Sequence, residues 1–146
     1  MVKLCILGCI LAAFPTHGQS TAEKEVIAVV DQLFAGMRQS DSAAVRQVFA
    51  SEAQLHTVSN DRTLRQTSLA QFLTAIGTPH DEVWDEQVTS YEVRIDGPLA
   101  TVWTPYRFYR GEAFSHCGTN AFQLYRSPDG WKILQITDTR KKEGCE

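Results

Sequence analysis

Residues 83–139 read VWDEQVTSYEVRIDGPLATVWTPYRFYRGEAFSHCGTNAFQLYRSPDGWKILQITDT, and this stretch decides the fold. It is rich in β-branched and aromatic side chains, which favour strands. Three turn-forming segments interrupt it, at 96–98, 110–112 and 127–130, and each contains a glycine. The pattern predicts four long strands joined by tight turns, which form an antiparallel meander.

The segment before these strands carries helical patterns instead. Ser20 and Glu23 have the spacing of a capping box, and apolar residues then recur every three or four positions. The predicted elements are helices at 21–39, 41–49 and 67–77 and short strands at 53–58 and 62–65. Helices and strands occupy different parts of the chain, so the predicted fold class is α+β.

The first 18 residues have the pattern of a secretory signal peptide. Lys3 precedes an apolar run at 4–14, and small or polar residues follow it. The run is shorter than the roughly 20 residues that a membrane-spanning helix needs, so we expect cleavage rather than a permanent anchor. The sequence therefore predicts an exported protein, periplasmic or secreted, with a signal peptide at 1–18 and a single domain at 19–146.

Charge and motif content exclude several kinds of partner. The formal charge is −3 and becomes −4 without Lys3, which is unfavourable for a phosphate-binding surface, so nucleic acid is not an expected partner. No glycine-rich phosphate loop is present, and His56, His80 and His116 lack the spacing of a metal site. We expect no cofactor and no metal.

Two cysteines, Cys117 and Cys145, remain after the predicted signal peptide. An even number of cysteines in an exported protein is typical of a disulfide, because the compartment is oxidising. Two free thiols are the alternative. A bond between them would close a loop of about 28 residues and stabilise the fold by roughly 3 to 4 kcal/mol.

The three turns allow side chains to be assigned to the two faces of the sheet. Residues that face one another across a hairpin with an even-numbered loop have an odd index sum. One predicted face carries Trp84, Trp103, Arg107, His116, Asn120 and Gln135. The other carries Val102, Tyr106, Phe108, Cys117 and Asp138. A β-bulge in any strand would exchange residues between the two faces.

Both predicted faces carry large apolar side chains, whereas a sheet covered on one side only is normally polar on the other. The helices can cover one face, and we expect them on the face with Trp84, Trp103 and Trp131. The second face is then expected to be covered by a second copy of the chain in a C2 homodimer.

Three strings resemble the nuclear transport factor 2-like superfamily: ATVWTPYRFY at 100–109, FSHCG at 114–118 and GWKILQITDTR at 130–140. Within it they look most like the small exported bacterial proteins grouped as SnoaL-like or "putative lumazine-binding". The resemblance covers essentially the whole chain after the signal peptide. It implies a cone, in which a curved antiparallel sheet wraps around three N-terminal helices and leaves a pocket. Members include isomerases, dehydratases, hydrolases and proteins without enzymatic activity, so the fold does not specify the function.

Two histidines are candidate catalytic residues in such a pocket. His116 lies on the predicted concave face, where it is either a general base or a hydrogen-bonded core histidine. His56, on the first strand, either faces the cavity from the opposite wall or lies half-exposed on an edge strand. Asp138 falls on the other predicted face, which favours pairing with Arg140 over catalysis.

The aromatic content of the predicted concave face suits a flat, partly polar small molecule. The predicted ligand-pocket residues are Trp84, Trp103, Arg107, His116, Asn120 and Gln135. The tryptophans have a second interpretation as ordinary core. We expect an exported small-molecule-binding protein, and two alternatives remain open. One is a cofactor-free isomerase, dehydratase or hydrolase with a pocket histidine as base, and the other is a structural domain with a filled cavity.

Overall fold

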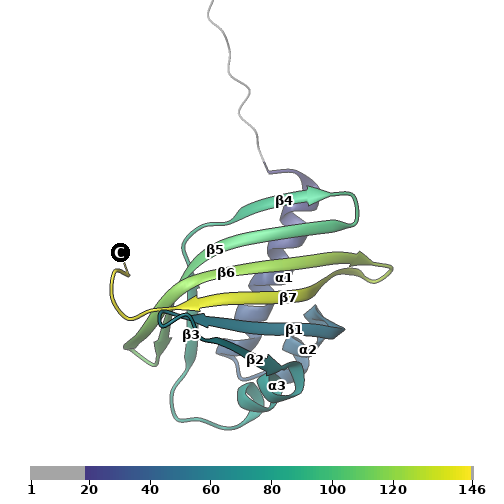
Figure 1. Ribbon diagram of the computed structural model, residues 1–146. Helices are drawn as coiled ribbons and strands as arrows, with labels where there is room; N and C mark the ends of the chain where they lie inside the picture. Colours follow the sequence, from purple (N-terminus) through teal and green to yellow (C-terminus); the bar gives the residue numbers. More distant parts are fainter. Residues whose placement is uncertain (1–18, 146) are drawn as a thin grey trace, which may run out of the picture.

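The structure is a computed structural model that describes residues 19–145. The predicted signal peptide at 1–18 lies outside the described residues. Figure 1 shows three helices against one curved sheet. The elements are α1 (Thr21–Arg38), α2 (Ser42–Val48), β1 (Phe49–Ser59), β2 (Leu64–Ser68), α3 (Leu69–Gly77), β3 (Trp84–Val88), β4 (Glu92–Asp96), β5 (Leu99–Arg110), β6 (Ala113–Ser127) and β7 (Gly130–Arg140). The predicted α+β class is confirmed.

The capping box at the start of α1 forms as the sequence predicts. The Ser20 hydroxyl accepts from the Glu23 amide at 3.2 Å, and the Ser20 amide donates to the Glu23 carboxylate at 2.6 Å. The apolar stripe that follows buries Val26, Val30 and Leu33 against the sheet. Helix α3 is capped by Ser68 rather than by Thr67. The helical half of the prediction therefore holds to within a residue or two.

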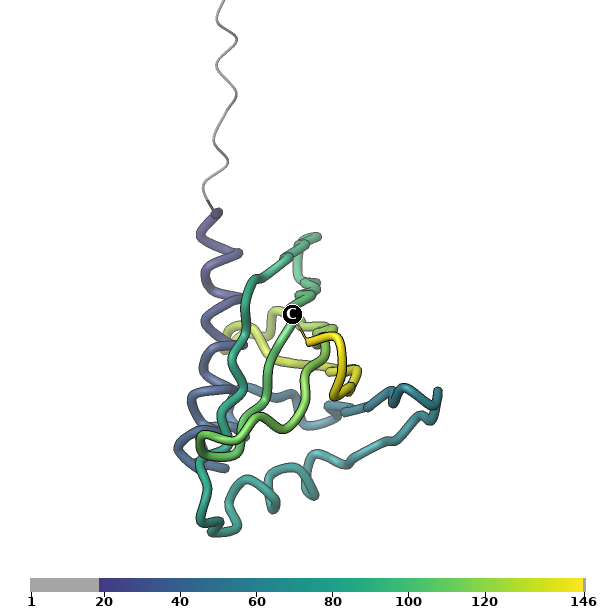
Figure 2. The backbone as a smooth tube through the Cα atoms, turned by 90° about the vertical axis from the view of Figure 1, so that its left-hand side faces the viewer, coloured from purple at the N-terminus to yellow at the C-terminus, as the bar shows by residue number. Residues whose placement is uncertain are grey.

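The strands form one sheet in the order β2-β1-β7-β6-β5-β3, and β4 also pairs with β5. All neighbours are antiparallel except β1 and β7, which run parallel. The first of the four predicted long strands is in fact two short ones, because β3 pairs with 106–110 of β5 and β4 with 99–103. Figure 2 shows α1, in purple, standing beside the strands, while β1, β2 and α3 bend away at its far end.

Two β-bulges set which side chains face the helices. The β5–β6 pairing begins as Arg110↔Ala113 and shifts to Phe108↔His116, which leaves Ser115 as the extra residue. The β6–β7 pairing shifts in the same way at Leu134. Each extra residue exchanges the two faces beyond it.

The bulges correct the predicted assignment of faces. Trp103, Arg107 and Gln135 lie on the outer face of the sheet, not on the concave face. The concave face instead receives Tyr106 and Phe108 of β5, both buried, in register with β6. Val102 and Asp138 are likewise buried on the concave side. His116, Asn120 and Trp84 keep their predicted side and line the space inside the sheet.

The core lies between this concave face and α1. Phe34 of α1 packs edge-to-face on Phe122 of β6, with ring centroids 6.2 Å apart. Trp131 and Ile133 of β7 complete the packing and are 5% and 0% exposed. Aromatic pairs of this kind add about 1 kcal/mol beyond the burial of their area. The core fills one end of the cone and leaves the other end to the site.

Candidate functional site

A cavity of about 240 Å³ lies between the concave face, α1 and α3. Its apolar walls come from both helices and from the sheet. They include Leu33, Phe34 and Met37 of α1, Phe72 of α3, and Phe108 and Phe122 of β5 and β6. Polar side chains from all of the strands except β4, and from α3, line the remainder. Apolar walls with a few converging polar groups are the usual composition of a small-molecule site.

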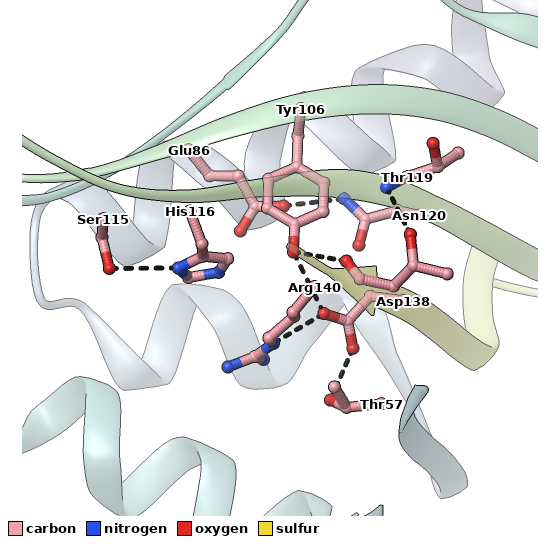
Figure 3. Close-up of polar contacts among 10 residues, drawn as sticks. Thr57, Glu86, Tyr106, Ser115, His116, Thr119, Asn120, Asp138 and Arg140 are labelled. Atoms are coloured by element: carbon pink, nitrogen blue, oxygen red, sulfur yellow. Dashed lines mark hydrogen bonds and ion pairs between the residues drawn. The ribbon is translucent and has the colours of Figure 1, made fainter. Parts of the chain in front are cut away.

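Asp138 of β7 is the centre of the polar cluster, and Figure 3 shows its contacts. Its carboxylate accepts hydrogen bonds from the Thr57 hydroxyl at 2.6 Å, the Arg140 Nε at 2.7 Å and the Tyr106 hydroxyl at 3.1 Å. The Tyr106 hydroxyl also lies 3.0 Å from the carbonyl of Thr139. Hydrogen bonds to a charged group are stronger than neutral ones, so this cluster fixes the end of β7.

The same cluster keeps Tyr106 protonated. Burial raises the pKa of Tyr106, and the negative charges of Asp138 and Glu86 raise it further. The hydroxyl is therefore a hydrogen-bond donor at any physiological pH. Tyr106 holds the cluster together and is not a base.

Glu86 of β3 is the group in the cavity that is poised to exchange a proton. Its Oε1 accepts a hydrogen bond from Asn120 Nδ2 at 2.7 Å, and the residue is half-buried in the lining of the cavity. Burial raises the pKa of Glu86 from 4.5 to about 7; the Asn120 hydrogen bond opposes this shift and the charge of Asp138 adds to it. Near neutral pH, Glu86 can therefore both donate and accept a hydrogen bond.

His116 lies in an aromatic setting at the same end of the cavity. Its ring is 4.9 Å from the Phe108 ring and 5.8 Å from the Tyr106 ring, and Nδ1 lies 3.1 Å from the Ser115 hydroxyl. Burial, and then the charge of Arg140, lowers the pKa of His116 to about 4. The imidazole is thus neutral at pH 7 and is a weaker base than Glu86.

Three of the predicted pocket residues meet in the cavity, namely Trp84, His116 and Asn120. The other three lie outside it. Trp103 is 54% exposed on the outer face. Arg107 donates a hydrogen bond to the carbonyl of Cys145, and Gln135 donates to Thr137 at 3.0 Å.

His56 is among the residues that line the cavity, but the strand directs the side chains of its two neighbours inward. Leu55 and Thr57 pair in register with Ile136 and Asp138, which face the cavity. His56 is in register with Thr137, and side chains alternate along a strand. The inner face of β1 therefore supplies Leu55 and Thr57 rather than the imidazole of His56.

Sequence reasoning missed Glu86, Tyr106, Asp138 and Arg140. Glu86 could have been found, because it lies two residues after Trp84 in a strand and so shares its face. The other three could not be assigned to the cavity, since the bulges at Ser115 and Leu134 carry no signature in the sequence.

The sulfur atoms of Cys117 and Cys145 are bonded, with their Cα atoms 5.8 Å apart. The bond ties the C-terminal tail to the outer face of β6, where the backbone of Lys141 also pairs with that of Cys117. Arg107 supports the same tail through its hydrogen bond to Cys145. The tail thus covers part of the sheet and leaves Cys117 only 4% exposed.

Two general features concern the described part of the chain, residues 19–145. No group of three or more His, Cys, Asp or Glu side chains in it is arranged to hold a metal ion. None of its helices combines the length and the apolar character that crossing a membrane requires.

Comparisons with solved structures identify the fold. An NTF2-like protein with a cystatin-like fold from Novosphingobium aromaticivorans superposes with a TM-score of 0.69 at 12% identity, over 84% of this chain and 83% of that one. An NTF2-like protein of unknown function from Shewanella baltica gives 0.64 at 15% identity, over 86% and 100%.

No curated protein sequence matches the chain closely enough to be a relative. The family model described as "Putative lumazine-binding" matches residues 21–137, which is nearly the whole of the described fold. The chain therefore belongs to this family, and its fold is that of the NTF2-like structures.

Proposed function

We propose that this protein binds a small, flat and mostly apolar molecule in the cavity between the sheet, α1 and α3. The observation that carries the proposal is the composition of the cavity, in which apolar and largely aromatic walls surround a few polar side chains, the cluster around Asp138 among them. Aromatic side chains provide stacking area, and the cluster around Glu86 and Asn120 provides donors and acceptors that orient a ligand.

The size of the cavity sets the size of the ligand. Sites for drug-sized molecules measure about 300 to 1,000 Å³, and this cavity, at about 240 Å³, is slightly smaller. A molecule of two fused rings is the appropriate scale. The family description names lumazine, which is a flat two-ring heterocycle, and this supports a ligand of that shape and size. An open cavity of this size also argues against the alternative of a filled, purely structural interior.

The enzymatic alternative depends on Glu86 rather than on a histidine. A general acid or base works best when its pKa is near the working pH, and Glu86 meets this condition while His116 does not. A cofactor-free isomerase or dehydratase would use Glu86 to move a proton on the bound molecule. Turnover that is lost in Glu86→Gln while the ligand still binds would favour this alternative.

The proposal is tested with a variant in which a larger side chain fills the cavity. Ala75 of α3 lines it and Ala70 of the same helix does not, while both alanines are exposed. Naphthalene-2-carboxamide, a neutral two-ring probe, is titrated calorimetrically into the wild type, Ala75→Phe and Ala70→Phe. We expect binding to the wild type and Ala70→Phe and at least a tenfold loss in Ala75→Phe. Equal binding to both variants would place the ligand elsewhere.

Glu86→Gln is expected to remove a pH dependence of stability. The folded-state pKa of Glu86 is raised, so the folded protein binds more protons than the unfolded chain between pH 4.5 and 7, and stability falls as pH rises through this window. The displacement of the pKa from 4.5 to about 7 corresponds to about 3 kcal/mol. The glutamine side chain mimics the protonated acid. The free energy of unfolding of the variant, measured in urea, should therefore rise relative to that of the wild type from pH 5 to pH 8. If the difference in free energy of unfolding between wild type and variant stays constant with pH, Glu86 ionises normally.

We also propose that the outer face of the sheet pairs with a second copy of the chain. Leu99, Trp103 and Tyr125 share this face and are exposed by 48%, 54% and 37%. Next to Trp103, β4 presents Glu92 and Arg94, which form an ion pair at 2.6 Å. A two-fold axis between two copies would let these opposite charges pair across the interface. Trp103 as an exposed aromatic anchor, with polar and charged side chains around it, supports a homodimer.

Trp103→Glu is expected to dissociate this dimer, because it would bury a charge at the centre of the interface. We expect the dimer dissociation constant to rise by about a hundredfold or more in sedimentation experiments. Leu64→Glu is the matched control, since Leu64 is 64% exposed on β2, far along the sheet. A wild-type protein that sediments as a monomer at every concentration would contradict the proposal.

Export of the protein remains a proposal, and the disulfide between Cys117 and Cys145 supports it because such bonds persist in oxidising compartments. The test is mass spectrometry of the intact protein from the periplasm or medium of its host. We expect a chain that begins near Gln19. A full-length chain confined to the cytoplasm would contradict the proposal.

A further inference from the structure

Two arginines lie at the same end of the cavity. Arg110 ends β5 and Arg140 ends β7, and both line the cavity together with His116 near the start of β6. The Arg140 side chain is 52% exposed, and Arg110 is exposed as well. The two guanidinium groups therefore mark the mouth, while the aromatic walls form the interior.

The charges at this mouth do not balance. Arg140 uses its Nε for Asp138, and no hydrogen bond between residues 19–145 involves its two terminal nitrogens. Arg110 takes part in none of the ion pairs between described residues. Asp138 already accepts from three donors, and Glu86 accepts from Asn120 and has its pKa raised by burial to about 7. A positive charge remains without a partner.

Several cationic side chains lie close enough to His116 to affect its protonation. The charges of Arg140, Arg110 and Lys142 all disfavour its protonated form, and only that of Asp138 favours it. Three cations from two strands and the C-terminal tail thus act on one ring that faces the cavity. Nδ1 shares a hydrogen bond with the Ser115 hydroxyl, and in the tautomer in which that hydroxyl donates, the neutral ring carries its proton on Nε2 and is a hydrogen-bond donor to a ligand.

We propose that this mouth is an anion subsite, in which Arg110, Arg140 and His116 bind a carboxylate on the ligand while its rings occupy the aromatic interior. The proposal rests on the proposed function and narrows it to flat aromatic acids. A guanidinium group matches a carboxylate in two parallel hydrogen bonds, which adds geometric selectivity. A phosphate fits less well, because its second charge would approach both Asp138 and Glu86.

Such a ligand is expected to bind more tightly as pH falls. Besides the subsite, the groups that face Glu86 are Asp138 on β7, Tyr106 on β5 and Asn120 on β6, while α1 presents only apolar side chains. Between pH 8 and pH 6, Glu86 gains a proton and its repulsion of an anion disappears. An aromatic carboxylate stays ionised over this range, so its affinity should rise several-fold.

The experiment compares three probes of one shape: naphthalene-2-carboxylate, its neutral carboxamide and its cationic carboxamidine. Titration of the wild type at pH 7 should give a carboxylate affinity about tenfold above that of the carboxamide, with the carboxamidine weakest. Arg110→Gln should abolish this preference while the carboxamide still binds, which also shows that the variant is folded. Arg126→Gln is the control, because it removes the same charge at the opposite end of β6, where Arg126 pairs with Glu25.

The outcomes separate the two proposals. Equal affinity for carboxylate and carboxamide would overturn the anion subsite and leave the binding cavity standing. A preference that survives Arg110→Gln would also overturn it. Failure of all three probes to bind would overturn both. A carboxylate preference that grows from pH 8 to pH 6 in the wild type, but not in Glu86→Gln, supports the subsite independently of Arg110.

Discussion

Replacing Gly118 by alanine is expected to destabilise the protein by about 3 kcal/mol or more and to disrupt the polar cluster. A Cβ at this position would lie 1.7 Å from the carbonyl oxygen of Thr139 and 3.0 Å from the ring of Tyr106. The first contact is with backbone, so no side-chain rotation relieves it, and β7 must move away from β6. The Tyr106 hydroxyl, which lies between the Thr139 carbonyl and Asp138, would lose its position at the same time.

Urea unfolding monitored by circular dichroism measures this loss. Gly97→Ala is the control, because nothing lies within 4 Å of its added Cβ and its only penalty is a φ of +54°. That penalty is about 1 kcal/mol. A Gly118→Ala variant no less stable than Gly97→Ala would show that β7 does not approach Gly118 so closely.

Replacing both Cys117 and Cys145 by serine is expected to lower the free energy of unfolding by roughly 3 to 4 kcal/mol. The bond spans 28 positions in the sequence, and without it the unfolded chain gains the corresponding freedom. The tail that Arg107 and Lys141 hold on the outer face would also loosen.

Thermal unfolding with and without a reductant checks this expectation. The wild type should lose stability when reduced, while the double variant should be indifferent to the reductant. A wild type whose unfolding temperature does not respond to complete reduction, verified by thiol titration, would contradict a stabilising role for the bond.

The helices and turns were predictable because their signals are local. The capping box of Ser20 and Glu23 and the glycines at 97, 111 and 130 act within a few residues of where they occur. Both of these features predict where an element starts or stops. Neither depends on the rest of the chain.

The faces of the sheet were predictable only up to the first bulge. The predicted alternation of side chains between the two faces holds at the pair Arg110 and Ala113. The assignment of faces reverses after Ser115 and again after Leu134. A bulge depends on how strands pack and curve, so a period-two count cannot detect it. For this reason Trp103 was predicted inside the cone and is outside it.

The residues of the site were predictable only where their assignment to a face did not depend on a bulge or on pairing between distant segments. Trp84, His116 and Asn120 stayed on the expected face, and Glu86 follows from its spacing to Trp84. The contact of Thr57 with Asp138 depends on the parallel pairing of β1 with β7. Such pairing joins segments 81 positions apart and has no local signal. The electrostatic centre of the site is therefore a product of the tertiary fold.

Native mass spectrometry of protein purified from its host tests the binding cavity most directly, with wild type and Ala75→Phe prepared side by side. The wild type should carry a small non-protein mass that is released on denaturation, and Ala75→Phe should lack it. Ligand binding between the sheet and the helices would be contradicted if wild type and variant carried the same additional mass. It would also be contradicted if the wild type carried no additional mass and did not bind two-ring probes.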